Sequence, residues 1–545
     1  MELVEELRRW RVVPDRLRHR AETAPDDPFL DCGSGMMTFG EVHRRAEAAA
    51  GGLSALGIGR GDRVALVLPN CTEFAIALFA LARLGAVQVP INVFLKGDFL
   101  RHQMADAGAV AVIADAPGLR SVAKIADDLP DLRWRILVGG GSPADTDESS
   151  DASGTPHTLT FDALEAGDAV APPVELVQSD LISIMYTSGT TGAPKGCMLS
   201  HGYYTYVPWS WFENDWYSTS DHLITAMPMF HIAAQAMIMM AALQGGMPAT
   251  VLPSFSASAF MAEAAKAGAT MAFGVGPMAM ALLASPPGPH DRAHTLRRSV
   301  FPPMPPAARE AFLERFGVAA IAEGYGQTEV NPLTQSPWDR QGMTLGCLGL
   351  PSPYLDVAVL DDAGRRLPDG AVGEICIRPR EPEVMFSGYW NRPEATVEAS
   401  RGLWHHTGDA GKVDERGYLV FVDRKKDALR RRGENISSME LEAAIVRHPL
   451  ITAAAVHGVA ADLGDDDVKA WIVTEPGAEL DPVELHDWFA ENLPYFTVPR
   501  YVQLTTSLPV NALGRVQKFM LRETDEPATW DFEARGLKIQ KARRR

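Results

Sequence analysis

The chain contains Tyr186-Thr-Ser-Gly-Thr-Thr-Gly-Ala-Pro-Lys-Gly196 directly after a predicted strand. These eleven residues include three glycines, four Ser or Thr hydroxyls and one lysine. Glycines let backbone N–H groups turn toward an anion, and the hydroxyls and the ammonium add further donors, so the segment predicts a polyphosphate-binding loop. It is not a Walker loop, because the ending Gly-Lys-Ser/Thr is absent. A polar surface turn is the alternative, but such a turn needs fewer donors.

Short β-branched runs alternate with helical patterns on both sides of this loop. That alternation predicts parallel sheets covered by helices. The expected strands lie at 63–68, 109–114, 134–138, 181–185, 269–275 and 318–322. From about residue 355 the pattern changes to consecutive strands at 355–360, 373–377 and 418–422, separated by Asp-Ala-Gly and Glu-Arg-Gly turns. This change predicts a separate antiparallel lobe.

The C-terminal part begins with the charged stretch DRKKDALRRRGEN after residue 422. A helix from Met439 and strands at 451–456, 468–473 and 501–504 follow, which predicts a small α+β domain on a charged hinge. The most apolar stretches, near 74–94 and 227–248, are interrupted by polar residues and are interpreted as buried helices. Residues 139–157 have little to bury and predict a flexible surface loop.

Composition narrows the class of protein. A chain of 545 residues predicts several lobes, and a net charge of −18 argues against nucleic acid as a partner. The five cysteines form no CxxC pair, which disfavours a zinc site or a disulfide framework and favours the reducing cytoplasm. The N-terminus lacks the pattern of a signal peptide, and no clean membrane span is expected.

Seven ordered motifs closely resemble the superfamily of acyl-CoA synthetases, nonribosomal-peptide adenylation domains and luciferases. Besides the loop, they are Met37-Thr-Phe-Gly-Glu41, Gly324-Tyr-Gly-Gln-Thr-Glu329, Tyr389-Trp-Asn-Arg-Pro-Glu394, His406-Thr-Gly-Asp409, Asp423-Arg-Lys-Lys-Asp427 and Leu508-Pro-Val-Asn-Ala-Leu-Gly514. The resemblance implies an α/β adenylation domain, 1–423, with two parallel-type sheets and a distorted β-barrel lobe. It also implies a mobile α+β domain, 424–545, that pivots near Lys426.

The resemblance implies ATP, Mg²⁺ and coenzyme A as cofactors. Phosphate contacts are expected from Thr187, Ser188, Gly189, Thr190, Thr191 and Lys195. The adenine and α-phosphate contacts are expected from Gly324, Tyr325, Gly326, Gln327 and Thr328. Glu329 is the expected Mg²⁺ ligand. The remaining cofactor contacts are expected from Asp409 at the ribose, from Val422 and Arg424, and from Gly433 beside the pantetheine, with Arg430, Arg431 and Arg432 near the CoA phosphates.

Two segments depart from the family pattern. Arg515 stands where the family has its adenylation lysine, so either Arg515 or Lys518 is expected to perform that role. Residues 301–306 read Phe-Pro-Pro-Met-Pro-Pro where the family often has Gly-Gly-Ala-Pro, and this stiffer loop is expected to narrow the substrate pocket.

The acyl pocket is expected to be lined by Tyr206, Trp211, His231, Gln235, Phe273, Gly274 and Gly324. Aromatic residues are dense at 203–217, which suits an aromatic acid or a quaternary ammonium, while core packing is the simpler interpretation. The segment 430–438, RRRGENISS, resembles the carnitine/crotonobetaine–CoA ligase branch.

The sequence thus predicts an acyl-CoA ligase acting on a small or medium carboxylic acid, with a homodimer as one assembly it allows. Two alternatives stay open. The first is the same adenylation with another acceptor or anion, as in transfer to a carrier-protein thiol or activation of nitrite. From another class, a silent nucleotide-binding module is the third hypothesis, although Lys195, Glu329, Asp409 and Arg424 are all retained.

Overall fold

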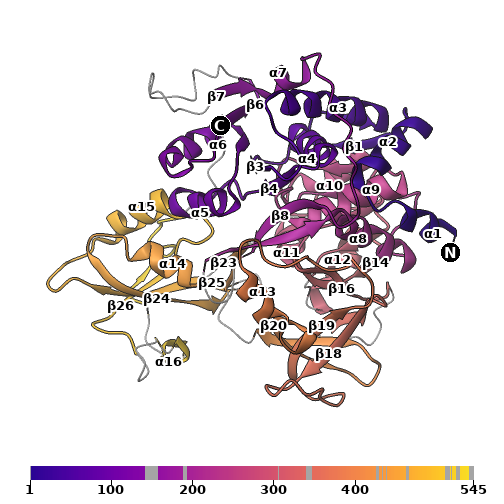
Figure 1. Cartoon of the computed structure of the whole chain (residues 1–545). Helices are drawn as coiled ribbons and strands as arrows, with labels where there is room; N and C mark the ends of the chain where they lie inside the picture. The colour runs from indigo at the N-terminus through magenta and orange to yellow at the C-terminus, as the bar shows by residue number, and fades with distance from the viewer. Residues whose placement is uncertain are drawn as a thin grey trace. The chain divides into compact units, whose positions relative to one another are not determined.

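The computed structural model describes residues 2–140, 157–187, 193–302, 304, 306–338, 347–424, 429–431, 434–436, 438–461, 466–509, 516, 518–522, 524 and 528–538. The chain forms two compact units (Figure 1). The first consists of Met1–Val93, Arg101–Tyr186 and Gly196–Asp423, and the second of Phe94–Leu100, Thr187–Lys195 and Arg424–Arg545.

The first unit contains a mainly parallel sheet that leads to the phosphate motif. Its strand order is β7 (His157–Thr160), β6 (Trp134–Val138), β5 (Ala111–Asp115), β3 (Arg63–Val67), β4 (Val87–Pro90), β8 (Leu181–Thr187) and β9 (Lys195–Ser200). Within the described residues, the strand pairings from β7 to β8 are parallel. Helix α3 (Phe39–Ala55) precedes β3, and the helices between the strands are α4 (Thr72–Leu84), α5 (Gly97–Ala107), α6 (Ala116–Ala123) and α7 (Phe161–Glu165).

A second seven-stranded sheet is parallel except at one edge. Its order is β14 (Ala320–Ala322), β13 (Arg298–Val300), β12 (Met271–Phe273), β10 (Leu223–Thr225), β11 (Ala249–Val251), β1 (Pro28–Asp31) and the antiparallel β2 (Met36–Thr38). The accompanying helices are α1 (Glu2–Arg9), α2 (Val13–Thr23), α8 (His201–Glu213), the π-helix η3 (Ala233–Met239), α9 (Met240–Gly245), α10 (Phe260–Ala267), α11 (Gly276–Ala284) and α12 (Pro306–Phe316). The two sheets confirm the predicted α/β class.

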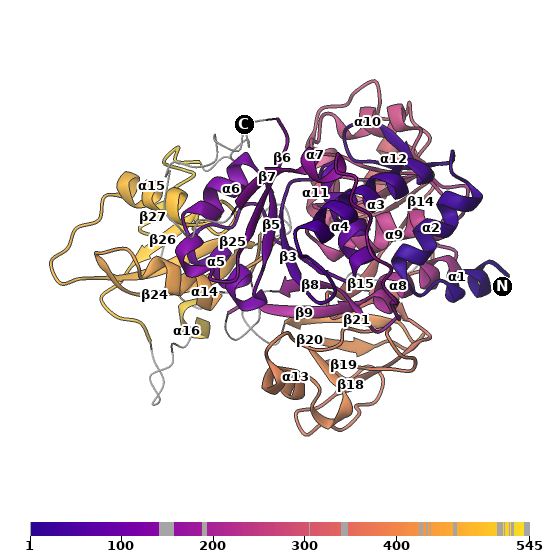
Figure 2. The same cartoon turned by 45° about the horizontal axis from the view of Figure 1, so that its top comes forward.

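The third sheet is antiparallel, and Figure 2 shows its orange strands grouped beside α13 (Pro393–Ala399). The strand order is β15 (Gly324–Gln327), β16 (Val330–Gln335), β17 (Cys347–Pro351), β21 (Leu419–Arg424), β20 (His405–Val413), β19 (Gly373–Pro379) and β18 (Leu355–Leu360). Within the described residues β15 and β18 are unpaired edges, so the predicted distorted barrel is wrong and the lobe is an open sheet. The strands from β16 to β18 each pair with their neighbours in this order, and within the described residues β18 does not pair with β15.

The second unit is the small α+β body expected after residue 423. A four-stranded sheet runs in the order β24 (Ile451–Ala460), β25 (Asp466–Thr474), β26 (Tyr501–Leu504) and β27 (Trp530–Asp531). The hairpin β22 (Leu429–Arg431) and β23 (Glu434–Ile436) and the helices α14 (Ser438–Ile445), α15 (Pro482–Asn492) and α16 (Lys518–Arg522) complete it.

The two apolar stretches predicted as buried helices behave differently. Residues 74–94 are not one helix: α4 ends at Leu84, Gly85 takes a left-handed conformation, and β4 enters the first sheet between β3 and β8. The later stretch is helical and buried from Ala233 to Gly245, with a π-helical first part. None of the described helices has the length and apolar character to span a membrane. Of the predicted loop at 139–157, residues 141–156 lie outside the described residues.

Candidate active site

The phosphate motif joins two neighbouring strands. Thr187 ends β8 and Lys195 begins β9, while the predicted ligands Ser188, Gly189, Thr190 and Thr191 fall outside the described part of the chain. At Gly196 a side chain does not fit, because a Cβ there would lie 2.5 Å from Ile184 Cγ2. This glycine is therefore required by close packing rather than by an unusual backbone angle.

The motif Tyr389–Glu394 continues the β9 side of the loop. The N–H of Trp390 donates to the carbonyl of Gly196 at 2.8 Å. Met198 forms two further backbone bonds, donating to Gly388 O at 2.9 Å and accepting from Ser387 N at 2.8 Å. Backbone pairing thus fixes the strand that leaves the phosphate loop against residues 387–390 of the antiparallel lobe.

The β8 side of the loop is tied to the same motif through Asp106. The hydroxyl of Tyr186 donates to Asp106 Oδ2 at 2.8 Å, and Arg392 Nη2 is 2.7 Å from Asp106 Oδ1. The carboxylate is largely buried, with a side-chain exposure of 10%. Burial, together with the neighbouring carboxylate, raises the pKa of Tyr186, so its phenol remains a donor. Both flanks of the loop are therefore braced by residues 389–392.

Glu329 lies in the short turn between β15 and β16 and is buried. The hydroxyl of Tyr389 donates to its Oε1 at 2.9 Å, and its carbonyl accepts the Phe386 N–H at 2.9 Å. His405 lies nearby, where burial lowers its pKa and the Glu329 charge partly opposes that shift. A buried, acceptor-only carboxylate that is held in one orientation fits the oxygen preference of Mg²⁺.

The predicted ribose ligand Asp409 brings two separate motifs together. Tyr325 O–H donates to Asp409 Oδ2, and Gln327 Nε2 donates to the same oxygen at 3.1 Å. Gln327 Nε2 also donates to the carbonyl of Thr407 at 2.9 Å. Asp409 is buried. The predicted adenine and ribose residues thus form one hydrogen-bonded cluster, which joins side chains of β15 to Asp409 of β20.

Four of the predicted acyl-pocket residues gather around one aromatic cluster. Trp211 lies 4.4 Å from Trp216 and 5.6 Å from Phe273, measured between ring centroids. A Cβ built on Gly324 would be 3.4 Å from Trp216, and one on Gly274 would be 2.4 Å from the ring of Phe301. The 301–306 segment thus reaches this cluster through Phe301, which is fully buried.

The other predicted pocket residues belong to different networks. Tyr206 is fully buried, and its hydroxyl lies 2.9 Å from Ser352 Oγ. Gln235 Oε1 accepts from Gln88 Nε2 at 2.6 Å and from Tyr204 O–H at 2.8 Å inside the core. His231 is partly exposed beside Phe230. The structure therefore does not group Tyr206 and Gln235 with Trp211.

Comparison with known proteins agrees with this geometry. Residues 17–390 match the AMP-binding enzyme family, and residues 440–515 match the AMP-binding enzyme C-terminal domain. The chain belongs to the AMP-binding enzyme family. It is 34% identical to the crotonobetaine/carnitine–CoA ligase of Salmonella typhimurium, over 89% of this chain and 93% of the relative. As a member of this family, the protein is an acid–thiol ligase.

Solved structures give the same fold. The anthranilate CoA ligase AuaEII in complex with anthranoyl-AMP superposes with a TM-score of 0.69 at 25% identity, covering 94% of this chain and 96% of the other. The amide bond synthetase McbA from Marinactinospora thermotolerans superposes with a TM-score of 0.78 at 25% identity, covering 94% and 99%. The o-succinylbenzoate CoA synthetase of Bacillus subtilis, with a TM-score of 0.80 at 24% identity over 94% and 98%, shows the fold alone.

In the C-terminal unit of this AMP-binding enzyme, Lys518 is engaged in an internal contact. Its Nζ lies 2.6 Å from Glu442 Oε1 and donates to Ser438 Oγ at 2.6 Å. Arg431 is likewise buried and paired with Asp467 at 3.1 Å, a contact that opposes the expectation that it meets CoA phosphates. Arg515, Lys426 and Gly433 lie outside the described residues. For Val422 and Arg424 the structure gives only the backbone position in β21.

Sequence reasoning missed two residues of the site. Tyr389 was visible as the first residue of a recognised motif, but the motif itself does not state which carboxylate the tyrosine meets. Asp106 carried no signal, because an isolated aspartate near the end of a helix is usually a solvated surface residue. The structure reveals their contacts by bringing residues far apart in sequence together.

Proposed function

We propose that this enzyme joins a small or medium carboxylic acid to the AMP half of ATP and transfers the acyl group to the thiol of coenzyme A. The contact of Glu329 with Tyr389 carries the proposal. It links the predicted metal-binding carboxylate to the same short segment that braces both flanks of the phosphate loop. A silent nucleotide-binding module would not need a buried carboxylate held by a tyrosine.

The chain's own residues would supply positioning and charge for the first step. Thr187, Lys195 and the intervening loop would hold the β- and γ-phosphates, while Tyr325 and Asp409 would hold adenine and ribose. The substrate carboxylate then attacks the α-phosphorus, and the bond to pyrophosphate breaks. Glu329 would hold Mg²⁺, which neutralises phosphate charge when bound.

The second step needs a thiol and a good leaving group. The thiol of coenzyme A attacks the acyl carbonyl of the adenylate, its proton leaves to solvent, and AMP departs with the electron pair of the broken acyl–oxygen bond. We place a hinge near Lys426, between an adenylation domain at 1–423 and a C-terminal domain at 424–545, because both steps use one pocket. The five free cysteines fit a reducing cytoplasm.

The aromatic cluster narrows the substrate class. The π-faces of Trp211, Trp216 and Phe273 pack together, and a Cβ on Gly324 would lie 3.4 Å from Trp216. Such faces suit a trimethylammonium group or an aromatic ring. Since the curated relatives are named crotonobetaine/carnitine–CoA ligases, a betaine-type acid is the first candidate and an aromatic acid the second.

ATP–pyrophosphate exchange tests the first step. The panel contains crotonobetaine, carnitine, anthranilate, benzoate, butyrate and nitrite, each with the wild type and with Glu329→Gln. We expect exchange with at least one carboxylic acid and a loss of about a hundredfold in the variant. Coenzyme A, a carrier protein and a simple amine are then added separately to find the acceptor. Exchange with nitrite alone, or with nothing in the panel, contradicts the proposal.

A further inference from the structure

Strand β20 bulges out of its ladder at the predicted ribose carboxylate. Two pairs bracket the bulge, Cys376 with His406 and Glu374 with Ala410. Between them β19 has one residue, Ile375, whereas β20 has three, Thr407, Gly408 and Asp409. Gly408 has φ +73°, a left-handed conformation that favours glycine. A bulge of this kind redirects side chains but leaves backbone groups without ladder partners.

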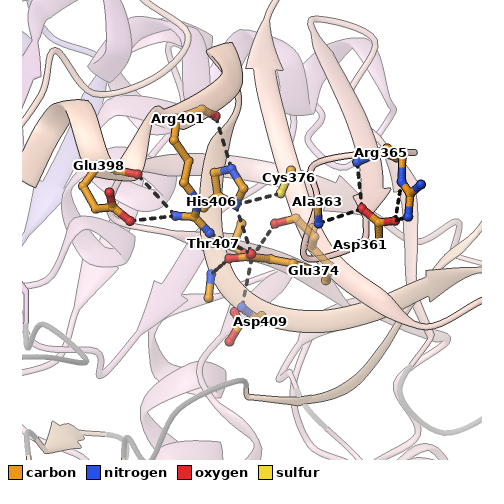
Figure 3. A network of polar contacts seen from close by, with 12 residues as sticks. Asp361, Ala363, Arg365, Glu374, Cys376, Glu398, Arg401, His406, Thr407 and Asp409 are labelled. Carbon is orange, nitrogen blue, oxygen red and sulfur yellow. Dashed lines mark hydrogen bonds and ion pairs between the residues drawn. The ribbon is translucent and has the colours of Figure 1, made fainter. Parts of the chain in front are cut away.

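The buried carboxylate of Glu374 lies at the base of this bulge (Figure 3). Its Oε1 accepts the Gly408 N–H at 3.2 Å. Its Oε2 accepts from Arg401 Nη2 at 3.2 Å and lies 3.0 Å from His406 Nδ1. The Glu374 carboxylate therefore replaces a missing backbone acceptor in the bulge. It is itself held by Arg401 and His406.

Thr407 closes the other half of the bulge. Its Oγ1 donates to the Ile375 carbonyl at 2.7 Å and accepts the Asp409 N–H at 3.1 Å. With Gly408 and Asp409 both bonded through their N–H groups, the Asp409 carboxylate is presented toward Tyr325 and Gln327. The sequence of contacts runs from Glu374 through the bulge to the nucleotide site.

We propose that Glu374 is a positioning residue that presets Asp409 for the two hydroxyls of the nucleotide ribose. This inference rests on the proposed function, in which Asp409 binds the ribose. The ligand atoms of Glu374, Cys376 and His406 lie within 4.8 Å of one another, so the trio is also a candidate metal site. The guanidinium of Arg401 on Glu374 Oε2 favours the hydrogen-bonded clamp, because a cation at that oxygen would meet a like charge.

Calorimetric titration of the full chain with AMP and with 2′,3′-dideoxy-AMP tests the proposal. Glu374→Gln keeps the shape of the side chain but weakens its hold on Arg401 and His406. We expect its affinity for AMP to fall about tenfold, while affinity for the dideoxy nucleotide stays unchanged, because the latter lacks the hydroxyls that Asp409 would bind. Glu398→Gln is the matched control, since Glu398 also pairs with Arg401 but is exposed.

The outcomes separate cleanly. Equal losses for both nucleotides, or no loss for either, overturn the positioning role. One zinc per wild-type chain that is missing from Glu374→Gln, measured by metal analysis, overturns it in favour of a metal site. Absence of AMP binding in wild type and in Glu398→Gln instead contradicts the proposed function itself.

A second pair of variants, at Thr407, tests the proposal even if the Glu374 variant fails to fold. Thr407→Ser keeps the hydroxyl that bonds Ile375 and Asp409, whereas Thr407→Val removes it at similar size. We expect the serine variant to retain the wild-type preference for AMP over the dideoxy nucleotide and the valine variant to lose it. Retention of the preference in both variants overturns the proposal.

Discussion

The phenol of Tyr389 donates a hydrogen bond of 2.9 Å to Oε1 of Glu329, and both side chains are buried. The tyrosine sits sixty residues after the glutamate in the chain. Cys197, two residues after Lys195, forms an isolated bridge with Tyr389. A single residue thus connects the exit of the phosphate loop to the predicted Mg²⁺ ligand.

Tyr389→Phe is expected to weaken Mg²⁺ use by freeing Glu329 to rotate. Loss of one hydrogen bond to a charged group predicts a rise of about tenfold in the Mg²⁺ concentration that half-saturates ATP–pyrophosphate exchange. The matched control is Tyr418→Phe, which removes the hydroxyl of a ring that is stacked on Arg416. An unchanged Mg²⁺ dependence in Tyr389→Phe would remove this tyrosine from the site.

Asp106→Asn is expected to loosen the β8 side of the phosphate loop. The amide cannot accept from Tyr186 and Arg392 as the carboxylate does, so we expect the KM for ATP to rise about fivefold with a smaller change in kcat. Steady-state kinetics at varied ATP measures this. Asp128→Asn serves as the control, because that exposed carboxylate lies 4.0 Å from Arg101 in a weak surface pair. Parallel behaviour of the two variants would contradict the bracing role.

We expect Lys518 to have a structural role and Arg515 a catalytic one. Lys518→Met leaves Glu442 without its cation in a largely buried position, which predicts a loss of about 2 kcal/mol in the stability of the C-terminal unit. Arg515→Ala is expected to lower pyrophosphate exchange at least tenfold, and Arg515→Lys to restore it. Thermal melting and exchange assays on the three variants check this. Loss of exchange in Lys518→Met without a change in melting would reverse the assignment.

His201 is expected to make stability fall in mild acid. Complete burial lowers its pKa to about 4, whereas an unfolded histidine titrates near 6.5. Between these values the unfolded chain binds a proton that the folded chain does not, so this contribution is full above about pH 6.5 and is lost as pH falls toward 4. The size is on the order of 3 kcal/mol.

Denaturant titrations from pH 4 to 7 measure this dependence, with His201→Asn as the comparison. Asparagine can accept the Val13 N–H that His201 Nδ1 accepts at 3.4 Å, but it does not titrate. We expect the difference in stability between wild type and variant to change across the window. A constant difference would show that His201 contributes nothing to acid sensitivity.

Local patterns predicted some strands with their bounds and failed where apolar runs were ambiguous. The strands at 134–138, 355–360 and 501–504 were predicted with the limits they have in the structure. The stretch 74–94 was misassigned because a mainly apolar run suits a buried helix and a buried parallel strand equally, and only the turn at Gly85 separates the two elements. The barrel failed because closure depends on pairing between strands distant in sequence.

The site was predictable as motifs but not as contacts. Tyr325, Gln327 and Asp409 were expected to serve one nucleotide, and the structure brings them into hydrogen-bond contact. Tyr206 and Gln235 were expected in the pocket, and the motifs did not predict their hydrogen bonds to Ser352 and to Gln88 and Tyr204. The difference arises because a motif fixes spacing along the chain, whereas a side chain's partner depends on tertiary packing.

The backbone bond from Trp390 to Gly196 has a consequence for dividing or recombining this chain. A fragment that stops after the two parallel sheets would still carry every letter of the glycine-rich motif. It would lack residues 387–390, whose backbone is hydrogen-bonded to Gly196 and Met198. Domain-swapped chimaeras should therefore exchange residues 181–200 and 386–392 together, since segments from different parents would not be matched in their packing.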